Sequence, residues 1–343
     1  MQILRLIGEI DVFKGRWSAL SNMSAERLSV LKRVATIESV GSSTRIEGVL
    51  LSDEEIKALL SNLKPQSLRS RDEQEVAGYA ELMETIFANW QHIPSTENQI
   101  KQLHGILLKY SHKDERHRGN YKTTNNHVEA FGPDGESLGI IFKTASPFDT
   151  PFRMTELITW TEESFKANVI HPLLIIAVFV VVFLAIHPFK DGNGRLSRAL
   201  TTLLLLKSGY AYLPYSSLES VIEHNKEAYY LALRSTQSTL DNEQPDWHSW
   251  ILFFLQCLHK QRENLERKIG QENLLVGEMP VLANRIIELI RDREQIKIAE
   301  IEKLTGESRS TIKLRLNDLI KLGKISRHGR GPATWYTLAK RGG

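Results

Sequence analysis

The chain has 343 residues, of which 41% are hydrophobic, enough to bury a sizeable core in two or three domains. Its net charge of +3 conceals an asymmetry, because residues 281–343 hold 14 Lys and Arg against 7 Asp and Glu, a balance of +7 that leaves −4 for the remainder. Such a basic region favours an anionic partner. The single cysteine, Cys257, excludes an internal disulfide and fits a reducing cytoplasm.

Neither a secretory signal nor a membrane span is expected. The N-terminal segment is amphipathic and contains acidic residues early, unlike a signal peptide. The apolar run at 173–186 is shorter than the roughly 20 residues that a membrane span needs. A helix of this length that is apolar on every side is typical of a protein centre. We therefore expect a cytoplasmic protein that does not associate with membranes.

Helical spacing of the apolar residues covers most of the chain. Between residues 3 and 87 they recur every three or four positions, and Ser52 followed by three acidic residues predicts a helix N-terminus. The expected fold class is mainly α. Further helices are predicted at 97–110, 153–165, 173–186, from about residue 195, at 217–238 and at 247–268.

Residues 117–151 interrupt the helical pattern, because they are rich in Gly, Asn, Pro and Thr. Two short strands are expected at 127–131 and 139–143, with residues 132–135 as the turn of a hairpin. A long surface loop is the alternative, and the pattern alone does not decide between the two.

The C-terminal region is predicted to be a winged helix-turn-helix domain. Helices are expected at 281–292, 298–304 and 308–323, then strands at 324–328 and 334–338 around a wing at 329–332. In DNA-binding domains of this kind the third helix, here with Arg309, Lys313 and Arg315, enters the major groove. Protein contact or dimerisation fits the pattern equally well, so DNA and protein partners both stay open.

Residues 187–198, HPFKDGNGRLSR, connect the buried helix to the next one. Gly192 and Gly194 permit positive φ angles and leave room for a ligand beside the backbone. Successive N–H groups of such a loop, together with a helix N-terminus, form an anion site. Arg195 and Arg198 lie on one helix face, and their guanidiniums suit phosphate oxygens.

Two further side chains of this segment suggest catalysis. Asp191 offers the oxygen ligands that Mg²⁺ prefers, and His187 has the intrinsic pKa of a general base near neutrality. The alternative is an ordinary glycine-rich turn between two helices with solvated arginines. That alternative is disfavoured, because a base, a metal-type carboxylate, two glycines and two spaced arginines fall within twelve residues.

The segment resembles the Fic signature, HxFx(D/E)GNGRxxR, at every specified position. The resemblance implies an all-helical core with a β-hairpin flap. It also implies transfer of AMP from ATP to a Ser, Thr or Tyr hydroxyl of a target protein or of the chain itself, with release of pyrophosphate. The protein substrate is expected to bind along the flap near 127–143 as an added strand.

The same resemblance implies roles for individual residues. His187 would take the proton of the target hydroxyl, and Asp191 would bind Mg²⁺ between the α- and β-phosphates. Phe189 would pack into the core and fix the loop. The nucleotide-binding residues would be Gly192, Asn193, Gly194, Arg195, Arg198, Asn225 and Tyr229, with Tyr230 beside them. For the last three, a half-buried aromatic helix without a role in binding fits the sequence equally well.

Residues 43–48, STRIEG, resemble the inhibitory motif of the family, (S/T)xxxE(G/N). In such proteins the glutamate pairs with the second signature arginine, so Glu47 is expected to compete with the γ-phosphate for Arg198. Ser43 begins the motif. The alternative is an ordinary helix end with a solvated Glu47.

The predicted organisation has a helical region with the inhibitory motif (1–95), a Fic core (96–270), a linker (271–280) and the winged helix (281–343). Removal of AMP, transfer of another phosphate-containing group as in the Doc branch, and a DNA-binding regulator with a sensory Fic domain are the alternatives for function. The Doc branch departs from GNG, which this chain retains. A homodimer is compatible with the sequence.

Overall fold

The computed structural model describes residues 1–19, 25–61, 68–131, 137–275, 281–321, 323–329, 331 and 334–339. The chain forms two compact units, Met1–Leu265 and Glu266–Gly343. The helices of residues 1–95 belong to the same unit as those of the predicted core, and the predicted linker at 271–280 starts within a helix that continues to Leu275. Residues 276–280 lie outside the described part.

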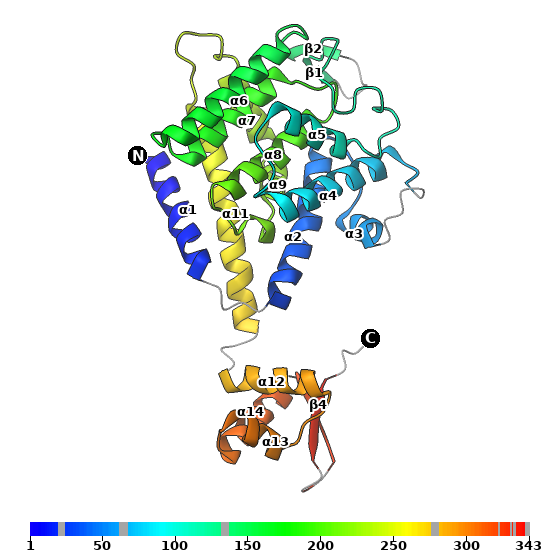
Figure 1. Cartoon of the computed structure of the whole chain (residues 1–343), viewed down its shortest axis with the longest axis vertical. Helices are drawn as coiled ribbons and strands as arrows, with labels where there is room; N and C mark the ends of the chain where they lie inside the picture. Colours follow the sequence, from blue (N-terminus) through cyan, green and yellow to red (C-terminus); the bar gives the residue numbers. More distant parts are fainter. Residues whose placement is uncertain are drawn as a thin grey trace. The chain divides into compact units, whose positions relative to one another are not determined.

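The first unit is built mainly of helices (Figure 1). In chain order they are α1 (Gln2–Ala19), α2 (Ala25–Ile46), α3 (Asp53–Ser61), α4 (Arg71–Asn89), α5 (Glu97–Leu107), α6 (Thr150–Ala167), α7 (Pro172–Ile186), α8 (Asn193–Lys207), the 3₁₀ helix η2 (Leu213–Tyr215), α9 (Leu218–His224), α10 (Lys226–Gln237) and α11 (His248–Leu275), whose residues after Leu265 belong to the second unit. The mainly helical fold class is thereby confirmed.

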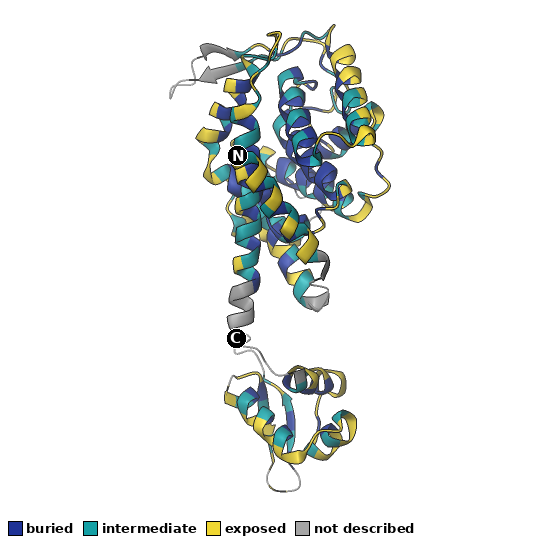
Figure 2. Ribbon diagram, turned by 90° about the vertical axis from the view of Figure 1, so that its left-hand side faces the viewer, coloured by how far each residue is buried: buried dark blue, intermediate teal, exposed yellow. Residues whose placement is uncertain are grey.

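Helix α7 forms the centre of this unit. It starts at Pro172, and the side chain of the preceding His171 caps it by accepting from the Leu173 N–H. Its apolar side chains pack against α6, α8 and α10, and the Trp250 indole of α11 donates to the Ala177 carbonyl at 2.6 Å. Figure 2 shows the buried interior of the unit in dark blue. In the described residues, no helix combines the length and the apolar character that crossing a membrane requires.

Helix α4 connects the N-terminal helices to the signature segment, because it contacts α2, α3, α5 and α8. Its N-terminus is fixed by a capping box, in which Ser70 Oγ accepts from the Glu73 N–H and the Glu73 carboxylate accepts from the Ser70 N–H. A fixed first turn places Arg71 and Glu75 beside the start of α8.

The predicted hairpin is confirmed, and the surface-loop alternative is wrong. β1 (Val128–Phe131) pairs antiparallel with β2 (Ser137–Phe142), with two irregularities of register. Residues 132–136, which include the predicted turn, lie outside the described part. The hairpin base therefore lies on the segment that leads from α5 to α6.

The helix predicted at 217–238 is two helices, α9 and α10, which meet at Asn225. Its φ of −122° leaves the helical region, and its side-chain amide donates to the Val221 carbonyl at 2.8 Å. A local side-chain bond of this kind competes with the helical ladder. The helix predicted at 97–110 similarly ends early, at Leu107.

The second unit has the predicted order of elements: α12 (Val281–Arg293), α13 (Ile298–Thr305), α14 (Arg309–Lys321), β3 (Ile325–His328) and β4 (Trp335–Leu338). β3 and β4 are antiparallel, and Tyr336 also bridges to Ile296. Its core contains Ile286, Ile290, Ile301, Ile312, Leu316 and Leu319. Residues 330, 332 and 333 of the predicted wing and its end are not described, and the winged-helix interpretation stays a prediction.

Candidate active site

The site begins where α7 ends, at a histidine in the left-handed conformation. His187 has φ 52° and ψ 59°, and its N–H donates to the Phe183 carbonyl, which closes the helix. A non-glycine residue adopts this conformation at a cost of about 1–3 kcal/mol unless its surroundings hold it there. Gly192, at φ 80°, provides the second left-handed residue just before α8. The chain thus reverses between two adjacent helices.

Hydrogen bonds inside the turn fix its shape. Asn193 Oδ1 accepts from the Phe189 N–H at 2.9 Å, and Asn193 Nδ2 donates to the Phe189 carbonyl at 2.7 Å. The Phe189 ring is fully buried, as predicted, and stacks on His104 with ring centroids 3.8 Å apart. Asn193 is predicted to bind the nucleotide, and the bonds of its amide to Phe189 show that its side chain also fixes the loop.

His104 on α5 was missed by the sequence analysis. It is fully buried, its Nδ1 accepts from the Gly119 N–H, and its Nε2 lies 3.0 Å from the Asp191 carbonyl. Because a carbonyl oxygen only accepts, Nε2 carries the proton. Burial lowers the pKa of His104 to about 4, so the ring stays neutral. A polar residue within an apolar helical stripe was the signal available in the sequence.

A second group that was missed joins the hairpin base to the turn. Asn126 Nδ2 donates to the carbonyls of His187 and Phe189, and Asn126 Oδ1 accepts from Lys122 Nζ and Thr144 Oγ1. The buried Lys122 ammonium also donates to the Ile186 carbonyl at 3.0 Å. Burial lowers the pKa of Lys122 to about 8. This network holds the strained backbone of His187 in place.

A cavity of about 530 Å³ opens beside the turn, a size typical of small-ligand pockets. Most of the residues predicted for the site share its lining: Glu47, His187, Asp191, Gly192, Asn193, Gly194, Arg198 and Tyr229. The hairpin base and α10 add Asn126, His127, Val128, Phe142, Tyr230 and Leu233 to the lining.

Two predicted nucleotide-binding residues do not line this cavity. The Asn225 amide is directed to the Val221 carbonyl at the end of α9. The buried Arg195 guanidinium lies 2.9 Å from Glu75 and 3.3 Å from Asp191, which separates it from the cavity lining. Larger open space, about 760 Å³, occurs in a groove between α2, α3 and α4, but that groove contains none of the predicted site residues.

His187 presents an unprotonated nitrogen. Its Nδ1 lies 3.2 Å from the Leu184 carbonyl, so Nδ1 carries the proton and Nε2 keeps a free lone pair. Burial lowers the pKa of His187 to about 4, with Lys122 acting in the same direction. The imidazole is therefore a neutral proton acceptor at physiological pH.

The two signature arginines have different carboxylate partners. Arg198 is buried, and its Nη2 lies 2.7 Å from Glu47 Oε1 and donates to the Ser43 carbonyl, while Nε donates to Ser43 Oγ. Both residues of the predicted inhibitory motif thus meet Arg198. Burial alone would raise the pKa of Glu47, but the Arg198 charge and hydrogen bond lower it overall, so Glu47 is ionised.

The space beside Gly194, in the first turn of α8, is too small for a side chain. A Cβ there would overlap the Glu47 carboxylate and approach Arg198 Nη1 to 3.3 Å. The Glu47 carboxylate therefore occupies the space directly beside the backbone that was predicted to cradle phosphates.

Comparison with known proteins assigns this segment to a family. Residues 94–205 match the model of the Fic/DOC family. This range of the chain includes the complete signature and the hairpin. The chain contains a Fic domain. Residues 276–334 match a family described as a bacterial protein of unknown function, DUF977.

Relatives of the Fic domain are distant. The chain is 28% identical over 208 residues to the "Protein adenylyltransferase Fic" of Drosophila grimshawi, covering 60% of this chain and 40% of that protein. For the protein of that name from Aedes aegypti the identity is 29% over 198 residues, covering 56% and 37%. The chain therefore spans about 40% of the length of the curated relatives it matches.

A solved structure shares the fold. A Fic family protein from Desulfovibrio desulfuricans G20 superposes with a TM-score of 0.67 at 24% identity, covering 100% of this chain and 97% of that one. The arrangement of helices around the Fic domain is thus found in an experimental structure.

Replacing Asn126 with Ala is expected to lower the free energy of unfolding by about 1–3 kcal/mol, because Lys122 and two carbonyls of the turn lose a partner. Urea unfolding followed by circular dichroism measures the change. Asn120→Ala is the matched control, since that exposed side chain bonds only the Arg118 carbonyl. Equal losses in the two variants would contradict the assigned role.

The neutral state of the His187 ring can be tested by NMR spectroscopy. In ¹⁵N NMR spectra, with His187→Ala used for assignment, the ring is expected to carry its proton on Nδ1 and to titrate well below 6.5. The reason is burial, which disfavours the imidazolium. A midpoint at or above 6.5, or a proton on Nε2, would refute this description.

Proposed function

We propose that this chain is a protein adenylyltransferase, which transfers AMP from ATP to a Ser, Thr or Tyr hydroxyl of a target protein or of itself. The observation that carries the proposal is the free Nε2 of His187, which lines the same cavity as the glycine-rich turn and Arg198. The names of the distant relatives support the same reaction class.

The proposed reaction uses few groups of the protein. His187 accepts the proton of the target hydroxyl as its oxygen bonds to the α-phosphorus of ATP. The bond from that phosphorus to the β-phosphate oxygen breaks, and pyrophosphate leaves. The first N–H groups of α8 have no partners within the helix and favour phosphate oxygens. Placement and charge stabilisation thus supply most of the catalysis.

The target is proposed to approach along the hairpin. His127, Val128 and Phe142, at the open ends of the two strands, line the same cavity as His187. A segment that pairs with the hairpin edge would bring its hydroxyl towards the cavity, a general mode of peptide binding. Tyr229 and Tyr230, which contact each other on α10, are proposed to face the nucleoside.

Asp191 fits a magnesium site with one protein carboxylate. Burial would raise its pKa, but Arg195 and the Gly192 N–H lower it overall, so the carboxylate is ionised and lines the cavity. No group of three or more His, Cys, Asp and Glu residues suited to a metal occurs within the described residues. Mg²⁺ commonly binds through one or two carboxylates, substrate phosphates and waters. Bound there, Mg²⁺ would neutralise charge on the phosphates.

Glu47 is proposed to inhibit the transfer. Its carboxylate holds Arg198 and fills the space above Gly194, so it competes with a phosphate for both the charge and the volume. About a third of the Glu47 side chain is exposed, which permits its displacement.

Replacing Glu47 with Gly is expected to raise AMP transfer by about tenfold or more, because Arg198 and the space beside Gly194 become available to ATP. Incubation with α-labelled ATP and Mg²⁺, followed by mass determination of the labelled protein, measures the rate. Glu47→Gln, which keeps the volume and loses the charge, should give an intermediate rate.

The control is His187→Ala in the Glu47→Gly background, which should retain no label. Equal labelling of wild type and Glu47→Gly would disprove the inhibitory role. Label that appears only as free AMP from a previously modified protein would instead assign the removal reaction to this site.

The second unit supports a separate proposal, binding of duplex DNA. Arg309 and Lys313 on α14 and Arg327 on β3 are exposed, in a region with a balance of +7. Basic side chains on such a helix and strand suit phosphate and base contacts.

The full chain is expected to bind duplex DNA in fluorescence anisotropy, with affinity falling at least about tenfold between 50 and 200 mM salt. Arg309→Ala with Lys313→Ala should weaken binding. The matched control is Arg285→Ala with Lys297→Ala, which removes the same charge elsewhere in the unit. Absence of binding at 50 mM salt would leave protein contact as the use of this unit.

A further inference from the structure

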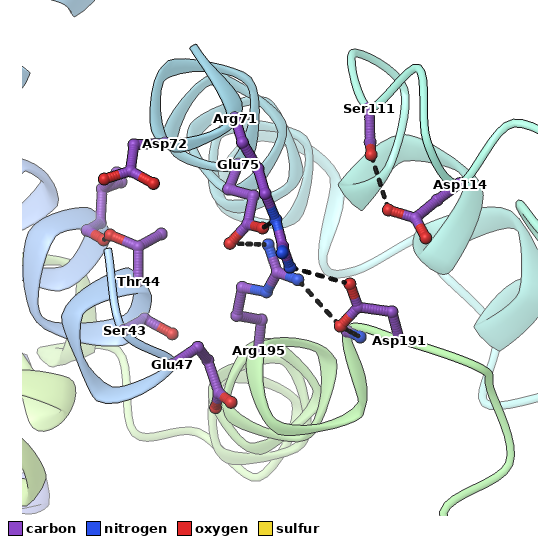
Figure 3. A network of polar contacts seen from close by, with 12 residues as sticks. Ser43, Thr44, Glu47, Arg71, Asp72, Glu75, Ser111, Asp114, Asp191 and Arg195 are labelled. Atoms are coloured by element: carbon purple, nitrogen blue, oxygen red, sulfur yellow. Dashed lines mark hydrogen bonds and ion pairs between the residues drawn. The ribbon is translucent and has the colours of Figure 1, made fainter. Parts of the chain in front are cut away.

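Four charged side chains of alternating sign form a ring beside the cavity (Figure 3). Glu75 of α4 lies between two arginines, with Oε1 accepting from Arg71 Nε at 2.6 Å and Oε2 lying 2.9 Å from Arg195 Nη1. The same guanidiniums lie farther from Asp191, at 3.3 Å for Arg195 and 3.5 Å for Arg71. Both arginines therefore lie closer to Glu75 than to Asp191, and Arg195 Nη2 also donates a hydrogen bond to Asp191 Oδ1.

Burial strengthens this preference. The Glu75 side chain is 7% exposed and that of Arg195 is 2% exposed, whereas Asp191 is 32% exposed and lines the cavity. A buried carboxylate is strongly unfavourable without a partner, so Glu75 retains the arginines. It lies in the second turn of α4, directly after the capping box at Ser70. Glu75 is thus part of the fixed framework, unlike the more exposed Glu47.

The ring has a consequence for cation binding at Asp191. A carboxylate whose two oxygens are both held by guanidiniums is a poor ligand, because the positive groups repel a cation and occupy its lone pairs. Since Glu75 draws Arg195 and Arg71 towards itself, the guanidiniums stay 3.3 and 3.5 Å from the Asp191 oxygens, and Oδ1 accepts its short hydrogen bond from the Gly192 N–H instead.

We infer that Glu75 is a positioning residue that keeps Asp191 available to Mg²⁺, an inference that rests on the proposed role of Asp191. Without the Glu75 charge, Asp191 is the remaining carboxylate of the ring, and Arg195 and Arg71 both turn to it. Arg71 acts in the opposite direction to Glu75, because its charge competes with the cation. Neither residue belongs to the Fic signature.

The test is the Mg²⁺ concentration that half-saturates binding of α,β-methylene-ATP, which cannot release AMP. It is measured by isothermal titration in the Glu47→Gly background. Glu75→Gln is expected to raise this concentration about tenfold or more, as found for residues that orient metal ligands. Arg71→Gln is expected to lower it. The variant with both substitutions should return towards the parent value, because the charge balance is restored.

Glu81→Gln is the matched control. Glu81 lies on the same helix but is bonded to Lys109 and Tyr110, which are not members of the ring, so the half-saturating concentration of this variant should equal that of the parent. Thermal unfolding confirms that each variant is folded. If Glu75→Gln does not fold, Arg71→Gln decides, since that side chain is 58% exposed.

The outcomes separate this inference from the proposed reaction. An unchanged or lowered concentration for Glu75→Gln, or an unchanged or raised one for Arg71→Gln, overturns the positioning role. If the half-saturating Mg²⁺ concentrations of the variants follow the expected order but α-labelled ATP never labels protein, the inference stands and the adenylyltransferase proposal fails. If α-labelled ATP labels protein but all variants have the same half-saturating Mg²⁺ concentration, the adenylyltransferase proposal stands and the positioning role fails. Absence of nucleotide binding at every Mg²⁺ concentration overturns both.

Discussion

The left-handed turn at His187 is the constraint on which the rest of the site depends. It directs the chain from the buried α7 into α8 within seven residues, and so places a histidine and a helix N-terminus on one cavity. The conformation is unfavourable for a residue with a side chain, and it persists because Asn126 holds the His187 carbonyl and Leu184 holds its Nδ1–H. The contact with Leu184 also leaves Nε2 unprotonated, so one interaction contributes to both the fold and the chemistry.

The charges around α8 are a second constraint on the site. Each signature arginine is paired with a carboxylate from a different N-terminal element. Arg198 meets Glu47, just after α2, and Arg195 meets Glu75 of α4. The two pairs differ in exposure. Glu47 lines the cavity and is about a third exposed, whereas Glu75 is enclosed between Arg71 and Arg195. A partly exposed and a buried carboxylate therefore contact one helix.

The sequence by itself determined the features that arise from neighbouring residues. Apolar spacing gave the helices and the largely buried α7, turn-forming residues left a hairpin and a surface loop equally open, and twelve contiguous residues grouped His187, Asp191, the glycines and the arginines. A helix end and the loop after it bring their own side chains together, so His187, Asp191 and Arg198 share one cavity. Local spacing failed at Asn225, where one side-chain bond divides a predicted helix.

Only the tertiary structure decided which distant groups complete the site. Asn126, His104 and Glu75 lie 61 to 120 positions away from their partners in the signature segment. In the sequence each is an ordinary polar residue in a loop or on a helix. Periodicity records which face of a helix is buried, but not which other element that face meets. The commitment of Arg195 to Glu75, and hence the position of its charge, is fixed by the packing of α4 against α8.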